Sequence, residues 1–501
     1  MVKRCVLAIA ASLLGCAAAT VCAADATAAG VGPCVPSGKG ADYQVGPEPG
    51  QLNSLADVPW DRLGSGDTVR IFARPQPYRG KVFLNGRGSA EAPIRVCGVR
   101  DSNGQRPVID GDRAESRQGL AYGNPLNESR SVVLINRLSS QPWQASPPSH
   151  LQIDGLHIRG AHPSYAFTDS KGQRRAYEKF SACIWIDRGE NVTIADNEIS
   201  DCSQGIMSRS TMDGDFAATK RLRIAGNHLH GNGIAGSYYE HAAYVQSVDV
   251  VYEFNRFGRM RDGAGGSAIK DRSVGTIVRY NRIEDGSRAL DLVEAEDYPD
   301  VARSDPRYRD TFVYGNVIVK DGRKGTTIHY GGDHAGSEDN YRKGTLHFFH
   351  NTVRLTGNGY AVLFQLSTLD EKAQVWNNVF LFDDTVPHPR MREGQDNAPG
   401  IESGGIVTLD RNWITSRWSD AGAGQKVGGQ LRGSSRMITA GRAPVDAVSL
   451  KPVKDSPIVG AAVAAPAGAV GHDVLWQIGP SGEVSPRKSS GAGGTLGALD
   501  P

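Results

Sequence analysis

The segment Val192-Thr-Ile-Ala-Asp-Asn197-Glu-Ile is followed 30 residues later by Leu222-Arg-Ile-Ala-Gly-Asn227-His-Leu. Both pieces alternate apolar and polar side chains, reach an Asn, and place an apolar residue two positions after it. Alternation predicts a strand, and Asn tolerates the left-handed bend that joins one strand to the next. The Asn-x-apolar signature recurs, at spacings of 30, 28, 26, 35, 35, 27 and 34 residues, at Asn197, Asn227, Asn255, Asn281, Asn316, Asn351, Asn378 and Asn412.

A second short run follows most of these Asn residues. These runs begin at Gly205-Ile-Met, Ala243-Tyr-Val, Ala268-Ile-Lys, Ala289-Leu-Asp, Thr327-Ile-His and Ala361-Val-Leu. Two or three short strands in each ~30 residues predict an all-β protein, a parallel β-helix whose coils stack ~4.8 Å apart. We expect the Asn amides to stack at one corner of the coils and to satisfy one another's hydrogen bonds.

The composition agrees with many turns between short strands. Among 501 residues there are 61 Gly and 26 Pro, and no long helical pattern is present. A β-propeller would repeat at ~40–50 residues with Trp-Asp or Gly-His signatures, and a sandwich would not sustain one pattern over so long a stretch. The net charge of +2 gives no electrostatic case for nucleic acid.

The first residues predict export. Lys3 and Arg4 precede an apolar run, 5–15, that is too short to span a bilayer, and small residues offer a cleavage site near Ala24. We expect a signal peptide over 1–24, a flexible segment over 25–39, and a periplasmic or extracellular protein. Leu13-Leu-Gly-Cys16 resembles a lipoprotein box, so anchoring through a lipidated Cys16 is the alternative. No other segment is long enough for a transmembrane helix.

Four cysteines remain after the predicted cleavage: Cys34, Cys97, Cys183 and Cys202. An even number in an oxidising compartment predicts disulfides. Three connectivities are possible, and proximity favours Cys34–Cys97 with Cys183–Cys202. A zinc site is disfavoured because no Cys-x-x-Cys or Cys-x-x-His pair exists.

Several further stretches resemble the pectate-lyase-like right-handed β-helix superfamily. At the two ends they are Trp60-Asp-Arg-Leu-Gly-Ser-Gly-Asp67, Pro107-Val-Ile-Asp-Gly111, Asp455-Ser-Pro-Ile-Val-Gly460 and Leu496-Gly-Ala-Leu-Asp500. Between them, Glu240-His-Ala-Ala-Tyr-Val245 and the stretch 266–272 resemble a group of exported bacterial β-helix proteins. The resemblance implies a right-handed helix over 40–384 with a short N-terminal cap, and over 385–501 the last coils with an irregular extension packed on them.

In-register stacking of the second strands predicts a ladder of side chains. We expect inward rungs at Ile184, Ile206, Ala243, Ile269, Leu290, Ile328 and Val362. Side chains alternate along a strand, so the following residues point outward. This outward ladder reads Trp185, Met207, Tyr244, Lys270, Asp291, His329 and Leu363. Its four central rungs are the predicted catalytic residues, together with Arg272.

The surface around this ladder suits an extended acidic polysaccharide, bound by a monomer. Predicted substrate-binding residues are Arg209, His241, Gln246, Arg288 and Tyr330, with sugar stacking on Tyr238, Tyr239, Tyr244 and Tyr298. Arginine binds carboxylates bidentately. The glycines in 263–266 would let a ligand approach the backbone closely.

The resemblance implies a lyase that cleaves a uronate-containing polymer by β-elimination. This reaction needs a cation at the uronate carboxylate, a base, and an acid for the leaving oxygen. Lys270 or Arg272 would supply the charge, and His329 or Tyr244 would move protons. Lys270 is itself a candidate base, provided that its pKa is lowered.

Three other functions stay open at this point. A glycoside hydrolase needs two or three carboxylates on one face, where the ladder offers only Asp291; a C5-epimerase would share the proton-abstraction step. Asp333-His334 resembles part of an alginate-epimerase signature whose remainder is missing. A non-catalytic polysaccharide-binding or surface protein would use the ladder only as ordinary cross-strand pairs. No cofactor is clearly indicated, and the weak Ca²⁺ candidates are Glu240, Glu294, Glu296, Asp297 and Asp300.

Overall fold

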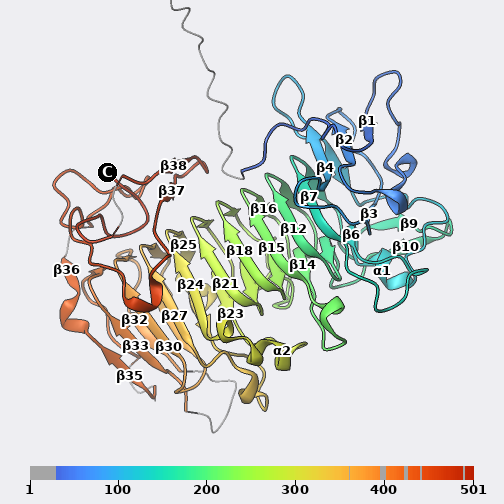
Figure 1. Cartoon of the computed structure of the whole chain (residues 1–501). Helices are drawn as coiled ribbons and strands as arrows, with labels where there is room; N and C mark the ends of the chain where they lie inside the picture. The colour runs from blue at the N-terminus through green and yellow to red at the C-terminus, as the bar shows by residue number, and fades with distance from the viewer. Residues whose placement is uncertain (1–29, 360, 395–401, 423–426, 441–442, 489–490) are drawn as a thin grey trace, which may run out of the picture.

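The chain winds into a right-handed parallel β-helix built from three long parallel sheets (Figure 1). The structure is a computed structural model that describes residues 30–501 except 360, 395–401, 423–426, 441–442 and 489–490. The predicted signal peptide and Cys16 lie outside the described residues. No helix in the described ranges has the length and apolarity needed to cross a bilayer.

Over residues 94–393 each coil contributes one strand to each sheet, and all strand pairs within the three sheets are parallel. The first sheet contains 13 strands, namely β1 (Asp42–Val45), β2 (Thr68–Phe72), β4 (Ile94–Val99), β7 (Ser149–Asp154), β12 (Glu190–Ala195), β15 (Lys220–Ala225), β18 (Val248–Glu253), β21 (Val274–Arg279), β24 (Asp310–Tyr314), β27 (Thr345–Phe349), β30 (Lys372–Trp376), β33 (Ile406–Leu409) and β35 (Gln430–Arg432). The second contains 11 strands, namely β5 (Val108–Asp110), β8 (His157–Arg159), β13 (Glu198–Ser200), β16 (His228–His230), β19 (Arg256–Phe257), β22 (Arg282–Ile283), β25 (Val317–Asp321), β28 (Thr352–Thr356), β31 (Val379–Phe382), β34 (Trp413–Thr415) and β36 (Ile438–Ala440).

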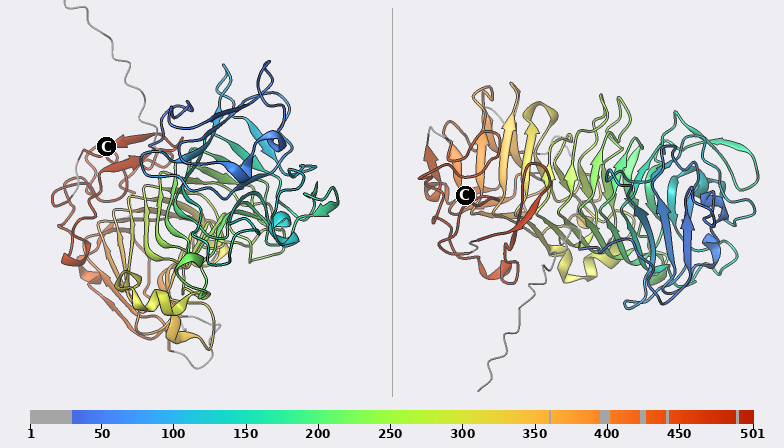
Figure 2. Two further views of the ribbon diagram at one scale, coloured as in Figure 1. Left: turned by 45° about the vertical axis from the view of Figure 1, so that its right-hand side comes forward. Right: turned by 90° about the horizontal axis from the view of Figure 1, so that it is seen from above.

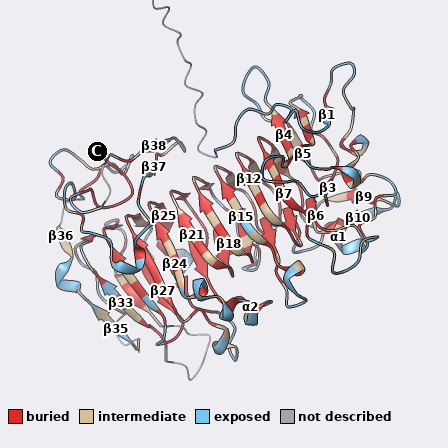
Figure 3. Ribbon diagram, in the orientation of Figure 1, coloured by how far each residue is buried: buried red, intermediate tan, exposed pale blue. Residues whose placement is uncertain are grey.

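The third sheet, which we name the groove sheet, carries the predicted ladder. Its 10 strands are β3 (Val82–Leu84), β6 (Ser131–Ile135), β11 (Ala182–Ile186), β14 (Gln204–Ser208), β17 (Ala243–Val245), β20 (Ile269–Asp271), β23 (Leu290–Leu292), β26 (Ile328–Tyr330), β29 (Ala361–Leu366) and β32 (Pro389–Glu393). Two short α-helices, α1 (Pro125–Ser129) and α2 (Pro299–Ser304), lie in the loops between strands. Figure 3 shows the strands largely buried and the loops exposed.

The predicted Asn stack is confirmed. Each amide nitrogen from Asn197 to Asn378 donates to the Oδ1 of the next Asn in the series, at 2.8–3.1 Å, and the series ends at Asn412. The expected place of the left-handed bend is wrong, because it falls on the residue before the Asn, as at Asp196 (φ 52°) and Tyr280 (φ 56°). The Asn amides also satisfy backbone carbonyls beside the bends, since Asn281 Nδ2 donates to Arg279 O next to Tyr280 and to Tyr252 O of the preceding coil.

The N-terminal end of the helix is closed by an extra strand and a buried indole. Strand β1 adds to the 13-strand sheet beside β2, and the indole of Trp60 is fully buried and donates to Leu55 O. Both favoured disulfides are confirmed: Cys34–Cys97 ties the N-terminal segment to β4, and Cys183–Cys202 lies inside the coils. Such cross-links persist in oxidising compartments, in agreement with an exported protein.

The C-terminal segment lies along one flank of the coils (Figure 2). Leu450, Ile458, Leu496 and Leu499 pack in one apolar cluster against Val379 and other residues of the 11-strand sheet. Ala498 N donates to Thr352 Oγ1 at 2.9 Å. The segment also contains the hairpin of β37 (Trp476–Ile478) and β38 (Val484–Pro486), whereas β9 (Ala166–Thr168) and β10 (Arg174–Ala176) form a hairpin near the N-terminal end.

Candidate functional site

The groove sheet aligns four proton-active residues on adjacent strands. Tyr244 pairs with Lys270, Lys270 with Asp291, and Asp291 with His329. Their alternate neighbours, such as Ile269 and Leu290, are fully buried in the interior of the coils. The predicted vertical alignment of these positions is therefore present.

The final predicted rung is wrong by two residues. Ile328 pairs with Phe364 and His329 with Gln365, in place of Val362 and Leu363. The strand β29 is six residues long, and a shift of two residues keeps every side chain on its original face. Apolar alternation alone could not distinguish the two registers.

A groove of about 1150 Å³ lies over this part of the sheet. Its floor includes Tyr244, Lys270 and Asp291, and its rim carries three exposed aromatic side chains, Phe180, Tyr238 and Tyr239. The ladder is not a solvated sheet face, since Lys270 is only 7% exposed and Asp291 only 2%. Loops that follow the strands cover it, so its charges interact strongly.

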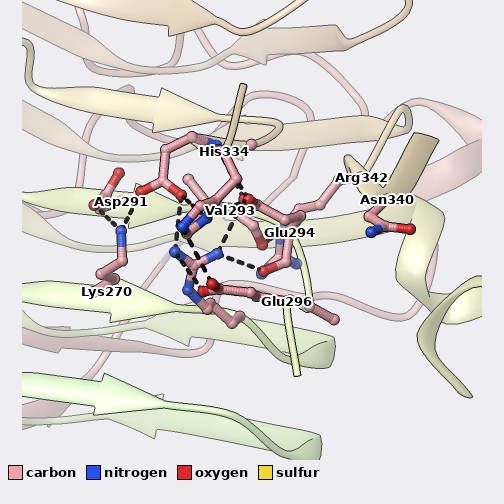
Figure 4. Close-up of polar contacts among 12 residues, drawn as sticks. Lys270, Asp291, Val293, Glu294, Glu296, His334, Asn340 and Arg342 are labelled. Atoms are coloured by element: carbon pink, nitrogen blue, oxygen red, sulfur yellow. Dashed lines mark hydrogen bonds and ion pairs between the residues drawn. The ribbon is translucent and has the colours of Figure 1, made fainter. Parts of the chain in front are cut away.

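Lys270 is held between two carboxylates. Its Nζ lies 3.0 Å from Asp291 Oδ2 (Figure 4). It also pairs with Asp333. Burial disfavours the ammonium, but Asp291 and Asp333 more than offset this effect, so the pKa of Lys270 is raised. Lys270 is therefore a fixed cation in this state, and the condition under which it would act as a base is not met.

Arg272 lies two residues after Lys270, directly after β20, and shares Asp333 with it. Its Nη2 donates to Asp333 Oδ1 at 2.8 Å, its Nη1 lies 3.0 Å from Glu294 Oε2, and its Nη2 lies 3.4 Å from Glu296 Oε2. Lys270 and Arg272 thus converge on the single carboxylate of Asp333. Sequence reasoning did not assign Asp333 a role, because it belongs to a loop after β26 and not to the ladder.

His334, next to Asp333, completes the ionic cluster at the groove edge. Its Nδ1 lies 3.0 Å from Glu294 Oε1 and its Nε2 lies 3.1 Å from Glu296 Oε1. Its contact with Asp333 and the charge of Glu296 raise the pKa of His334 to about 9. The imidazolium is half-exposed and balances carboxylates that Arg272 alone would not neutralise.

The prediction that His329 exchanges protons directly with a ligand is wrong. His329 is fully buried and does not line the groove. Its Nδ1 lies 2.8 Å from Asp291 Oδ1 and its Nε2 3.1 Å from Ser367 Oγ. Burial and Arg288 lower its pKa, so the ring is a neutral donor that orients Asp291 from behind. Asp291 also accepts from Arg288 Nη1 at 3.0 Å.

Tyr244 and His241 are the groove groups best suited to exchange protons with a ligand. Tyr244 Oη accepts a hydrogen bond from Arg272 Nε at 2.9 Å, and burial raises the pKa of the phenol. The Nδ1 of His241 accepts from Ser267 N at 2.9 Å, so the neutral ring carries its proton on Nε2. Burial, assisted by the charge of Lys270, lowers the pKa of His241 to about 3.

Other predicted binding residues lie elsewhere. Tyr330 is wrong as a groove residue, because its position in β26 has the same parity as Ile328 and its side chain is fully buried in the core. Tyr298 is also buried, with its hydroxyl donating to Ser247 O and Arg272 O. Arg209 lines a separate pocket, where it pairs with Asp187.

The remaining predictions concern Gln246 and the calcium candidates. Gln246 Nε2 donates to Asp297 Oδ2 at 2.9 Å, and Gln246 does not line the groove. A different trio, Glu294, Asp333 and His334, places ligand atoms within 4.8 Å of one another. Arg272 already supplies positive charge to Glu294 and Asp333, and a divalent cation there would be repelled by it.

The glycine-rich stretch has a packing role beside its place at the groove. A Cβ on Gly265 would lie 2.4 Å from the Tyr238 ring, and one on Gly266 would lie 1.7 Å from Glu240 O. These glycines therefore allow Tyr238 to lie flat at the rim and the preceding coil to approach closely.

Comparison with known proteins gives only distant structural similarity. No protein-family model matches the chain, and no curated protein does. A GH136 lacto-N-biosidase from Eubacterium ramulus is 12% identical over 80% of this chain and 68% of that chain, with a TM-score of 0.45. A PL6 family polysaccharide lyase from Pseudopedobacter saltans is 13% identical over 75% and 89%, with a TM-score of 0.40. An alginate lyase from Paenibacillus sp. str. FPU-7 is 14% identical over 75% and 93%, with a TM-score of 0.33.

Proposed function

We propose that this chain is an exported enzyme that cleaves a uronate-containing polysaccharide by β-elimination in the groove. The main support is that Lys270 and Arg272, both almost fully buried, bind the same carboxylate. A uronate carboxylate has the chemistry of Asp333 and would take its place between these two cations. The aromatic rim formed by Phe180, Tyr238 and Tyr239 offers flat surfaces for sugar rings.

The two cations would make the C–H bond next to the carboxylate more acidic. Charge that develops on the substrate carboxylate during proton abstraction would be stabilised by Lys270 and Arg272, which are preorganised by Asp291 and Glu294. Burial intensifies this stabilisation because little water screens it. Lys270 and Arg272 therefore stabilise negative charge on the substrate and do not act as bases.

Asp333 and Tyr244 would then move the protons. Burial opposes ionisation of Asp333, but Lys270, His334 and Arg272 hold its pKa below the usual value. When a substrate carboxylate takes over the cations, the pKa of Asp333 rises and it can accept the C5 proton. The electron pair forms the C4–C5 double bond, the C4–O bond breaks, and the Tyr244 phenol protonates the leaving oxygen.

Hydrolysis is the second candidate, favoured by the carboxylates along the groove. Asp291, Glu296, Asp333 and Glu393 all line it, and a hydrolase needs two carboxyl groups across the scissile bond. Asp291 fits this role poorly, since Lys270, Arg288 and His329 occupy its oxygens.

Product analysis separates the candidates. The mature protein is incubated with polygalacturonate and with alginate, and ultraviolet absorbance of unsaturated ends, reducing ends and chain length are followed. Elimination predicts new absorbance together with shorter chains, and loss of both in Asp333→Asn, with Lys372→Gln on the exposed surface as the control. Shorter chains without absorbance would establish hydrolysis, unchanged length with altered uronate stereochemistry would establish epimerisation, and unchanged polymers would contradict the proposal.

A further inference from the structure

A second pocket of about 430 Å³ lies on the same face of the groove sheet, nearer the N-terminal end. Three arginines line it, Arg130, Arg137 and Arg209, against a single carboxylate, Asp187. The groove differs, because its four Lys and Arg residues are matched by four Asp and Glu residues. The second pocket therefore carries the larger excess of positive charge, and its Arg209 follows β14, two strands before Lys270 in β20.

Arg130 offers the pocket a guanidinium that can bind an anion. Its guanidinium makes no hydrogen bond or ion pair with any residue in the described part of the chain; its side-chain contact is with the Trp185 ring, at 5.2 Å. Burial and the nearby charge of Arg209 lower the pKa of Arg130. Arg209 is bound to Asp187 through Nη1, at 2.9 Å. A guanidinium held close to another cation without its own acceptor favours a bound carboxylate.

An aromatic platform stands beside these cations. Trp143 lines the pocket and is 45% exposed. The guanidinium of Arg188 lies 4.3 Å from the centre of its ring and that of Arg137 lies 5.1 Å away. Arg188 Nη1 also donates to Trp143 O at 2.9 Å, which fixes the loop that carries the ring. An aromatic face next to cations is suited to a sugar ring with an acidic substituent.

The pocket and the groove lie along the same edge of the sheet. The residue immediately after each of five adjacent strands, β6, β11, β14, β17 and β20, forms a row that reads Asn136, Asp187, Arg209, Gln246 and Arg272. Strands are ~4.8 Å apart, so Arg209 and Arg272 are separated by about 10 Å. One extended chain can lie over both sites.

We propose that this pocket is a second binding site for a carboxylate-bearing sugar unit, which holds the polymer whose other end reaches the groove. The inference rests on the proposed function for the identity of the polymer, while the binding itself requires no reaction. Arg130 binds the carboxylate, Arg209 adds charge, and Trp143 stacks on the ring. The pocket thus adds to the selectivity for acidic polymers that Lys270 and Arg272 provide in the groove.

The test measures binding of polygalacturonate by affinity electrophoresis and calorimetry in a Lys270→Gln background, which slows turnover. Arg130→Gln and Trp143→Ala are each expected to weaken binding at least about tenfold, and Arg130→Gln also to flatten the salt dependence. The control is Arg62→Gln, whose side chain is 76% exposed and does not line the pocket. Circular dichroism and the unfolding midpoint verify that each variant is folded.

Two further polymers identify the ligand class. Neutral dextran is expected to bind neither the parent nor any variant. Dextran sulfate is expected to bind, but with a smaller difference in affinity between the parent and the variants than polygalacturonate shows. Affinity for polygalacturonate within twofold of the parent in both Arg130→Gln and Trp143→Ala, or absence of binding by the parent, overturns the site. Arg130-dependent binding confined to dextran sulfate overturns the carboxylate assignment.

The two proposals fail in different ways. If wild-type protein leaves polygalacturonate intact but binding depends on Arg130, the proposed reaction fails and the second site stands. If the polymer is cleaved with an unchanged KM in Arg130→Gln, the second site fails and the reaction stands.

Discussion

Lys270 Nζ donates to Asp291 Oδ2 at 3.0 Å, and this contact joins adjacent strands of the groove sheet. Asp291 is itself fixed by Arg288 and by His329, so the ammonium is held in one position. Although burial opposes ionisation, Lys270, Arg288 and His329 hold the pKa of Asp291 well below its usual value. Lys270 is therefore a preorganised charge, and its ammonium also pairs with Asp333 at the groove.

Replacement of Tyr244 by Phe tests the proposed acid. The ring remains and can still pack against His241, whereas the hydroxyl that accepts from Arg272 Nε is lost. We expect kcat to fall about 10²- to 10⁴-fold, the range for loss of general acid–base catalysis, in a variant that circular dichroism shows to be folded. The measurement is the initial rate of unsaturated-end formation, and Tyr239→Phe at the exposed rim is the matched control. A Tyr244→Phe enzyme with the wild-type kcat would exclude the phenol as the proton donor.

His241 predicts a specific pH dependence of stability. Its pKa is about 3 in the folded protein against an ordinary value of 6.5. Between these values the unfolded chain binds more protons, so acidification from pH 6.5 toward pH 3 favours unfolding by roughly 1.4 kcal/mol for each pH unit. When the free energy of unfolding is measured with urea between pH 3 and pH 6.5, it should fall less steeply with acidification in His241→Gln than in the wild type. Equal slopes of the unfolding free energy against pH in both proteins would contradict the assignment.

Asn281 lies in the middle of the Asn stack and tests its energetic role. Its Oδ1 accepts from Asn255, and its Nδ2 donates to Asn316, Tyr252 and Arg279. Asn281→Ala leaves several buried groups without partners, and we expect a loss of at least about 3 kcal/mol in the free energy of unfolding. Asn103→Ala in an exposed loop should stay within about 0.5 kcal/mol of wild type. A similar small effect at both positions would show that the stack is not stabilising.

Much of the fold was predictable because the β-helix repeats the same pattern of side chains in successive coils. The Asn at each corner and the alternation before it are visible in the sequence, and from them the partners Tyr244, Lys270, Asp291 and His329 follow by register alone. The same alternation would have placed Tyr330 in the interior, since it lies two residues after the inward Ile328.

The loops over the groove were not predictable in this way. Asp333 reaches Lys270 and Arg272 from a loop whose length and path are not repeated in other coils. The dipeptide Asp333-His334 was the one sequence signal that pointed to it. The burial of His329 could not be predicted for the same reason. It depends on the loops that cover the outward face of the sheet and not on the alternation within the strand that carries His329.

The kcat of Lys270→Gln on polygalacturonate decides whether the paired cations are the reacting centre. Removal of a preorganised charge that stabilises the developing anion predicts a fall of about 10²- to 10³-fold in the rate of unsaturated-end formation, with Lys372→Gln unchanged. Binding of the polymer should persist in the variant, measured in the same preparation. A folded Lys270→Gln protein that forms unsaturated ends at the wild-type rate would contradict the assignment of this chemistry to Lys270 and Arg272.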